Sequence, residues 1–170
     1  MVGNMSGGMG ELRDLRVGHG FDTHRFSDDP SRELILGGVR FEDTPGLVGH
    51  SDGDAVAHCI IDALLGAAGL GDVGALFPDT ENRWAGADSI GLLGDAVGCL
   101  ATAGWRIVNV DCTVVAEVPR VAPRRDEMQV CLSAAVGAPV SVKGKRAEAM
   151  GALGRQEGLA CWAVALIERR

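Results

Sequence analysis

The chain has 170 residues, of which 46% are hydrophobic, and its formal net charge is −7. This length suits one domain with a buried core, and the acidic balance argues against nucleic acid or an anionic membrane as a partner. Five widely spaced cysteines without a CxxC pair fit neither a secreted disulfide scaffold nor a zinc finger, so we expect free thiols and a cytoplasmic protein.

The first half of the chain predicts two strands followed by a helix. Residues 1–15 lack the apolar stretch of a signal peptide, so we interpret them as a flexible leader or an expression remnant before a single domain over 16–170. Strands are predicted over 16–22 and 34–41. Ser51 and Asp54 resemble a capping box, and apolar residues at helical spacing then predict a helix that stops at Gly69.

The second half continues this alternation. A charged loop, a helix, a strand, a helix and two strands are predicted, in that order, over 79–87, 88–103, 106–118, 123–136, 140–143 and 161–167. The most apolar stretch, 59–77, is interrupted by Asp62 and Asp72, which argues against a membrane span. The order of elements favours an α/β or α+β fold in which helices cover one sheet.

Carboxylates and histidines cluster at two points of this pattern. Asp22 and His24 end the first predicted strand, where residues two apart point to the same side. Asp54, His58 and Asp62 are spaced by four and share one helical face. An aspartate and two histidines could form a zinc site with an open fourth position. Alternatively, the first pair is a surface or capping arrangement and His58 is a half-buried, hydrogen-bonded histidine.

The order of short motifs along 16–170 resembles the 2-C-methyl-D-erythritol 2,4-cyclodiphosphate synthase family. Besides His58, the matching blocks are GHGFDTH at 18–24, HSDGD at 50–54, DALLG at 62–66, GDVG at 71–74, FPDT at 77–80, GADS at 86–89, NVD at 109–111, GR at 154–155 and EGLAC at 157–161. The match of so many ordered blocks carries more weight than composition or spacing.

The resemblance implies an α+β, two-layer fold: a mixed four-stranded sheet covered by helices on one face, in a homotrimer with its sheets around the three-fold axis. Asp22, His24 and His58 would bind Zn2+, and Glu148 a second divalent ion, Mg2+ or Mn2+. The expected reaction converts 4-diphosphocytidyl-2-C-methyl-D-erythritol 2-phosphate into the cyclic diphosphate and releases CMP, in active sites between subunits.

The resemblance also implies roles at the substrate. His50 would assist the reaction, and Asp54 and Asp62 would support the site or lie on the helix face rather than bind metal. Beside Glu148, and apart from the resemblance, we expect Arg146 to assist as well. The expected substrate contacts are Ser51, Asp72, Val73, Gly74, Phe77, Pro78, Asp79, Thr80, Glu81, Ala116, Arg120, Lys145 and Arg155.

One stretch departs from the family pattern. Threonines usually precede the metal-binding glutamate, but here Lys145, Arg146 and Ala147 precede Glu148. The two cations could replace the hydroxyls as stronger donors to phosphate, or they could form a solvated basic patch. If the nucleotide pocket has instead diverged, the chain would be a different metal-dependent phosphoryl-transfer enzyme or a non-catalytic, diphosphate-binding trimer.

Overall fold

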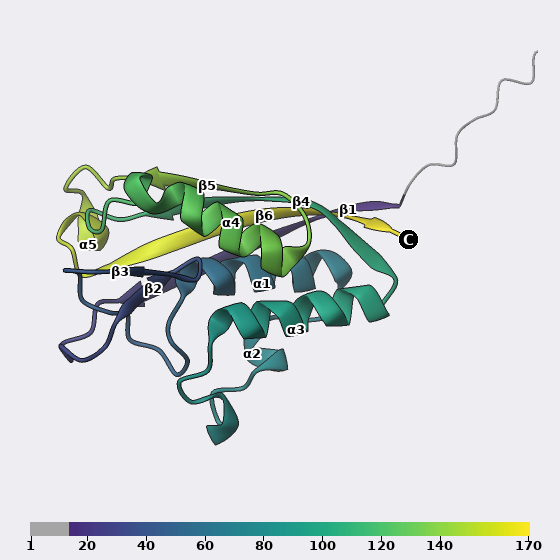
Figure 1. The fold of residues 1–170 in the computed structure, drawn as a ribbon, viewed down its shortest axis with the longest axis horizontal. Coiled ribbons are helices and arrows are strands. Elements are labelled where there is room, and N and C mark those ends of the chain that lie inside the picture. The colour runs from purple at the N-terminus through teal and green to yellow at the C-terminus, as the bar shows by residue number, and fades with distance from the viewer. Residues whose placement is uncertain (1–13) are drawn as a thin grey trace, which may run out of the picture.

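A mixed four-stranded sheet organises the computed structural model, which describes residues 14–170 (Figure 1). Its strand order is β1-β6-β4-β5. β6 pairs antiparallel with β1 and β4, and β5 pairs parallel with β4. The bounds are Leu15–Arg25 for β1, Trp105–Val115 for β4, Val140–Lys145 for β5 and Gly158–Arg169 for β6. The predicted mixed four-stranded sheet is confirmed; the predicted leader lies almost wholly outside the described residues.

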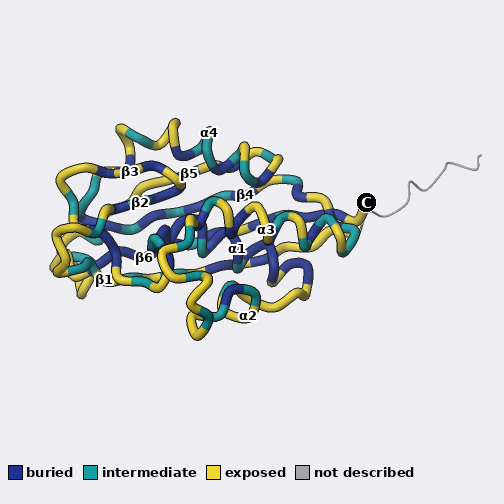
Figure 2. Tube along the Cα trace, turned by 60° about the horizontal axis from the view of Figure 1, so that its bottom comes forward, coloured by how far each residue is buried: buried dark blue, intermediate teal, exposed yellow. Residues whose placement is uncertain are grey.

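Three long helices cover one face of this sheet. They are α1 (Ala55–Ala68), α3 (Ser89–Thr102) and α4 (Arg125–Val136). Strand residues alternate between buried and exposed, as expected when only one face is covered (Figure 2). On the uncovered face, Val17, Phe21 and Val164 are 69%, 46% and 45% exposed. Among the described residues, no helix has the length and apolar content needed to cross a membrane.

The predicted strand over 34–41 is wrong, because this segment is a tight hairpin. β2 (Leu34–Leu36) pairs antiparallel with β3 (Val39–Phe41). Gly37 and Gly38 form the turn with φ angles of 59° and 72°, values that glycine adopts without the strain of a Cβ atom. The local apolar pattern is the same for one strand or two, so only the glycine pair marked the reversal.

The start of α1 also differs from the prediction. Asp54, rather than Ser51, is the N-cap, and its carboxylate accepts hydrogen bonds from the N–H groups of Val56 and Ala57. The same carboxylate accepts the N–H groups of the hairpin glycines at 2.8 and 2.7 Å. Asp54 is fully buried and therefore anchors the hairpin to the helix. The predicted stop is confirmed, since Gly69 caps the helix in the left-handed conformation.

Other boundaries shift by a few residues, and short elements appear that periodicity did not predict. These are α2 (Val73–Leu76), η1 (Asn82–Trp84), η2 (Ala122–Arg124) and α5 (Gly151–Gly154). Elements of three or four residues are too short to show a hydrophobic period. The predicted helix over 123–136 accordingly begins with η2 before α4, and β4 ends before the cis peptide Val118–Pro119.

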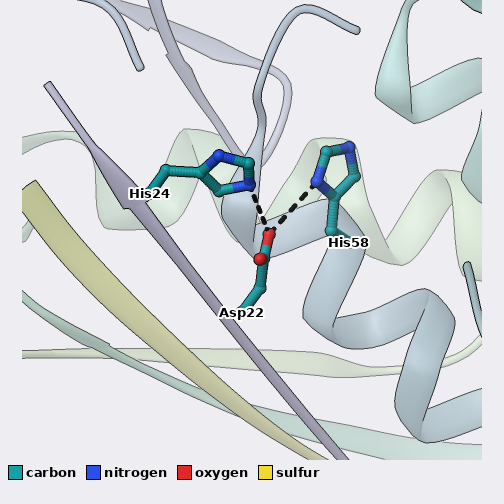
Figure 3. Close-up of side chains that lie close together, drawn as sticks. All are labelled: Asp22, His24 and His58. Atoms are coloured by element: carbon teal, nitrogen blue, oxygen red, sulfur yellow. Dashed lines mark hydrogen bonds and ion pairs between the residues drawn. The ribbon is translucent and has the colours of Figure 1, made fainter. Parts of the chain in front are cut away.

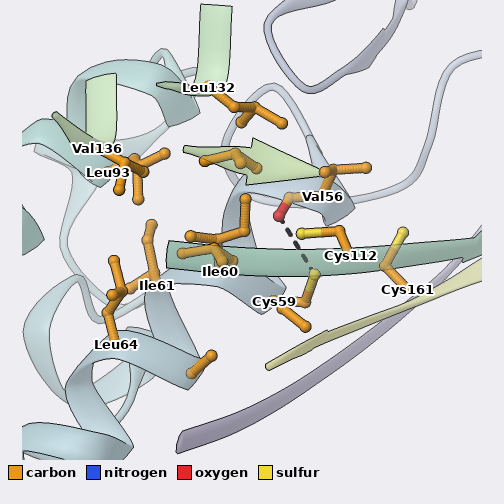
Figure 4. Close-up of a cluster of buried hydrophobic side chains, with 14 of the residues drawn as sticks. Val56, Cys59, Ile60, Ile61, Leu64, Leu93, Cys112, Leu132, Val136 and Cys161 are labelled. Atoms are coloured by element: carbon orange, nitrogen blue, oxygen red, sulfur yellow. Dashed lines mark hydrogen bonds between the residues drawn. The ribbon is translucent and has the colours of Figure 1, made fainter. Parts of the chain in front are cut away.

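The core fills the space between the helices and the sheet. Figure 4 shows Ile60, Ile61 and Leu64 of α1 beside Leu93 of α3 and Leu132 of α4, all fully buried. Cys59, Cys112 and Cys161 lie in the same cluster (Figure 4), and all five cysteines are free. Burial raises the pKa of the Cys59 and Cys161 thiols, which keeps them protonated and unreactive.

β1 lies unusually close to α1 because it presents glycine to the helix. A Cβ atom at Gly18 would be 1.8 Å from the Ala63 carbonyl oxygen, and one at Gly20 would be 1.9 Å from that of Cys59. The backbones can therefore touch where side chains would normally separate them. This contact brings the end of β1 next to the first turns of α1.

Candidate active site

Asp22, His24 and His58 meet where β1 passes α1 (Figure 3). Asp22 Oδ2 is 2.9 Å from His24 Nε2 and 3.1 Å from His58 Nδ1. One ligand atom from each residue can be chosen so that all three lie within 4.8 Å of one another. Within 14–170, this is the one cluster of three or more such groups that could hold a metal ion.

Each histidine has a partner at the ring nitrogen that faces away from Asp22. His24 Nδ1 is 2.5 Å from the Val48 carbonyl oxygen, which can only accept, so this nitrogen carries the proton. His58 Nε2 is 2.9 Å from Ser89 Oγ and 3.1 Å from Ser51 Oγ. With the outer nitrogens occupied, the inner nitrogens are available to an ion.

The electrostatics of the cluster are those of a cation site. Burial alone would raise the pKa of Asp22, but hydrogen bonds and charge from the two histidines outweigh it and hold that pKa well below its usual range. Burial would lower the pKa of His24, but the hydrogen bond to Asp22 and its negative charge raise it. A bound metal would replace the proton that this pair holds, because metal ligands must be deprotonated.

The donor set fits zinc. Ligands about 2.0–2.1 Å from a tetrahedral zinc ion are roughly 3.3 Å from one another. The two separations at Asp22 Oδ2, 2.9 and 3.1 Å, are close to that value. One carboxylate and two imidazoles leave a fourth position for substrate or water, as in catalytic zinc sites.

Asp54 and Asp62 lie outside this cluster. Asp54 is occupied at the helix start, and Asp62 accepts the Val73 N–H at 2.8 Å, which fixes the beginning of α2. Both contacts agree with the interpretation that these carboxylates support the site rather than bind the metal.

A pocket of about 280 Å³ opens beside His58. Its lining includes His50 and five of the predicted contacts: Ser51, Val73, Gly74, Phe77 and Asp79. The sequence pattern did not indicate Trp84 and Leu92, which also line it. Trp84 packs edge-on against Phe77, with ring centroids 5.0 Å apart, and its buried Nε1 has no protein partner. An aromatic residue within a charged loop was the available signal.

The remaining predicted contacts of this region are not among the residues that line this pocket. Asp72 caps α2 by accepting the Ala75 N–H at 2.7 Å. Glu81 pairs with Arg83 at 2.6 Å, and its carbonyl oxygen lies 3.3 Å from His50 Nε2. Pro78 and Thr80 lie in the loop between α2 and η1.

A second pocket, of about 240 Å³, joins the end of β5 to the segment after β4. It brings together Ala116, Arg120, Lys145 and Arg146, as the resemblance implied, and adds Arg125. Arg146 does not project freely: its Nε donates to Glu117 Oε2 at 2.9 Å. The Glu117 side chain, only 5% exposed, also accepts the Ala149 N–H at 3.2 Å.

Glu148 and Arg155 stand apart from the Asp22 cluster in the single chain. Glu148 is exposed on the turn after β5, with φ of 51°, and is not part of the Asp22–His24–His58 cluster. Arg155 donates to Glu157 at 2.7 Å. Neither prediction is tested by this arrangement of one chain.

Sequence comparison gives the family. Residues 15–168 match the YgbB family. The chain belongs to this family. It is 50% identical over 159 residues to the 2-C-methyl-D-erythritol 2,4-cyclodiphosphate synthase of Dechloromonas aromatica, in a match that covers 92% of this chain and 98% of that protein.

Two further relatives show how the family domain is used. The chain is 52% identical over 158 residues to the bifunctional enzyme IspD/IspF of Anaeromyxobacter dehalogenans, but spans only 40% of that protein's length. It also superposes on the CDP complex of IspF from Plasmodium falciparum with a TM-score of 0.79 and 32% identity, covering 92% of this chain and 97% of the other. The expected family and the expected α+β fold with a mixed four-stranded sheet are confirmed.

Proposed function

We propose that this chain is a metal-dependent 2-C-methyl-D-erythritol 2,4-cyclodiphosphate synthase of the non-mevalonate isoprenoid pathway. It converts 4-diphosphocytidyl-2-C-methyl-D-erythritol 2-phosphate into the cyclic diphosphate and releases CMP. The observation that carries this proposal is the Asp22–His24–His58 cluster beside a pocket that contains His50 and Ser51, in a chain that covers nearly all of a relative with that name.

Asp22, His24 and His58 would hold Zn2+, and Glu148 would hold Mg2+ or Mn2+. Bound there, the two ions supply Lewis acidity and neutralise phosphate charge. The support for zinc is the donor set and the proton-bearing outer nitrogen of His24. The support for the second ion is the exposed carboxylate of Glu148, held in a left-handed turn next to a cationic pocket.

The protein's main task is to fold the substrate back on itself. The 2-phosphate is already a competent nucleophile toward the β-phosphorus, so no general base is required. Orientation of two reacting groups can lower the barrier by about 7–11 kcal/mol in favourable cases. His50 and Ser51 would hold the phosphates, and Trp84 and Phe77 would exclude water from the methylerythritol portion. CMP would leave from the second pocket.

Lys145 and Arg146 would bind the cytidine diphosphate portion from that second pocket, with Ala116 and Arg120. Charged N–H donors form stronger hydrogen bonds to phosphate than the hydroxyls usual in this family. The structural relative from Plasmodium falciparum was solved with CDP, which supports a nucleotide as the ligand.

A homotrimer with active sites between subunits completes the proposal. The uncovered sheet face with Val17, Phe21 and Val164 offers apolar area for assembly. The separation of Glu148 from the zinc ligands in one chain also favours a site that two subunits share. Five free cysteines favour a reducing compartment, the cytoplasm.

The ion pair between Arg146 and Glu117 favours a second candidate. Because Glu117 neutralises one of the cations, the nucleotide pocket could have diverged. The chain would then be another metal-dependent phosphoryl-transfer enzyme, with no cyclic product, or a non-catalytic, diphosphate-binding trimer.

Phosphorus NMR of the protein with substrate, zinc and magnesium tests the proposal. We expect the cyclic diphosphate and CMP together, and loss of both in Asp22→Ala and Glu148→Ala. Asp28→Ala, which removes a 99% exposed carboxylate elsewhere, is the control and should keep wild-type turnover. Unchanged substrate, or CMP without the cyclic product, would refute the synthase assignment.

A further inference from the structure

A chain of hydrogen bonds runs from His58 through Ser89 to the carboxylate of Asp52, which is not one of the proposed metal ligands. His58 Nε2 is 2.9 Å from Ser89 Oγ, and Ser89 Oγ in turn donates a short hydrogen bond to Asp52 Oδ1. The Ser89 N–H donates to the other oxygen, Asp52 Oδ2, at 3.0 Å. Ser89 is fully buried, so its hydroxyl has to be satisfied by these neighbours.

A serine by itself would leave the tautomer of His58 undefined. A hydroxyl can accept a proton from Nε2–H, or it can donate its own proton to an unprotonated Nε2. In the second case the ring proton would sit on Nδ1, the nitrogen that faces Asp22 3.1 Å away. That tautomer cannot bind a metal through Nδ1. His24 has no such ambiguity, because its outer partner is a carbonyl oxygen.

Asp52 removes the ambiguity. An ionised carboxylate can only accept hydrogen bonds, so the Ser89 hydroxyl donates its one proton to the hydrogen bond with Asp52. Its lone pairs then face His58 and accept the Nε2–H. The Ser89 N–H holds the same carboxylate from a second direction, which fixes its orientation.

The two segments that carry this chain are tied together by backbone hydrogen bonds. The Asp52 N–H donates to the Ala87 carbonyl at 3.1 Å, and the Gly86 N–H donates to the His50 carbonyl at 2.8 Å. Asp52 Oδ1 also accepts the Asp54 N–H at 3.1 Å. The carboxylate is therefore held against Ser89 by the loop geometry on both sides.

From this geometry we propose that Asp52 is a positioning residue for the metal centre, acting through Ser89. It keeps His58 in the Nε2–H tautomer, with the Nδ1 lone pair directed at the cation. The inference rests on the proposed metal site and assigns two residues that do not touch the ion. Outer partners of metal-bound histidines commonly change metal affinity by about 10–100-fold when they are removed.

Ser51 is the competing partner, since its Oγ lies 3.1 Å from His58 Nε2. However, Ser51 Oγ already accepts the Gly53 N–H at 3.2 Å, and its own proton can go to Ser89 Oγ, 3.4 Å away, instead of to His58 Nε2. It can therefore share the Nε2–H but cannot by itself dictate which nitrogen is protonated. Replacement of Ser51 is expected to affect zinc binding less than replacement of Ser89.

Zinc affinity of Asp52→Asn, measured by competition with a chromophoric chelator, tests the proposal. The amide can donate to Ser89 Oγ, which frees the hydroxyl proton for His58 Nε2 and favours the wrong tautomer. We expect at least about tenfold weaker zinc binding, a similar loss in Ser89→Ala, and no further loss in the double variant. Asp88→Asn is the matched control: this exposed neighbour caps α3 through the Ile90 N–H, and asparagine caps equally well.

Nitrogen-15 NMR of the zinc-loaded protein gives the second readout. We expect a protonated Nε2 and a metal-bound Nδ1 for His58 in the wild type, and faster exchange of the Nε2 proton in Asp52→Asn. Wild-type zinc affinity in that variant, or equal losses in it and Asp88→Asn, would overturn the role of Asp52. A wild-type protein that binds no zinc would instead overturn the metal site itself, and with it the inference.

Discussion

The close contact between Gly20 of β1 and the α1 backbone predicts that Gly20→Ala will lower both the stability of the protein and its affinity for metal. A Cβ atom there would be 1.9 Å from the Cys59 carbonyl oxygen and 2.8 Å from the Ala63 nitrogen. Ordinary contact begins near 3.4 Å, so β1 and α1 would have to separate by about 1.5 Å, the difference between 3.4 and 1.9 Å. Both obstructing atoms belong to the helix backbone, which cannot turn aside as a flexible side chain can.

The expected cost follows from this overlap. Overpacking a core typically costs about 1–3 kcal/mol, and the rigid obstruction places Gly20→Ala at the upper end. Alanine's lower entropy cost, about 0.5–1 kcal/mol, offsets only part of it. We expect the free energy of unfolding to fall by about 2–3 kcal/mol. Zinc affinity should fall as well, because Asp22 and His58 lie on the two elements that would separate.

Urea denaturation at fixed protein concentration and chelator competition for zinc would measure both effects. Gly66→Ala is the matched control, since Gly66 lies exposed in α1 and a Cβ atom there would meet nothing within 4 Å. Alanine at this position should stabilise the protein by about 0.5–1 kcal/mol. If Gly20→Ala unfolds at the wild-type urea concentration and binds zinc normally, the close packing of β1 on α1 is not what positions the site.

Three other contacts lead to predictions of their own. Asp54→Ala should lower the free energy of unfolding by about 3 kcal/mol, because four backbone N–H groups, three of them buried, lose their acceptor. Asp54→Asn keeps an acceptor oxygen and should lose less in the same urea titration. In metal-free protein, the lowered pKa of Asp22 gives stability that is lost as pH falls, and the raised pKa of His24 gives stability that is lost as pH rises. Asp22→Asn should therefore destabilise the protein most between pH 3.8 and 6.5, the ordinary pKa values of the two groups. Equal destabilisation at pH 5 and pH 8 would contradict this. Arg146→Ala should raise KM for the cytidyl substrate by roughly tenfold without changing zinc affinity. An unchanged KM in steady-state kinetics would mean that Arg146 only forms the ion pair with Glu117 and does not contact the substrate.

The sequence by itself determined the family, the mixed sheet and the three residues of the proposed metal centre. Asp22 and His24 are two apart on a strand and His58 lies on a predicted helix, so periodicity made them candidates. The order of motifs along the chain then selected them as the expected metal ligands. The motif order added several residues of both pockets, but not Trp84, Leu92 or Arg125. These signals survive in sequence because each depends on neighbours within a few positions.

Only the tertiary structure decided which groups support those residues. The hairpin at Gly37 and Gly38 is held by a carboxylate 17 and 16 positions away, and Ser89 is 37 positions from Asp52. Glu117 meets Arg146 across 29 positions. Hydrogen bonds between such distant residues leave no periodic trace, because their geometry is set by the way β1, α1 and the loops pack together. The residues of the proposed metal centre were therefore predictable, and the contacts that orient them were not.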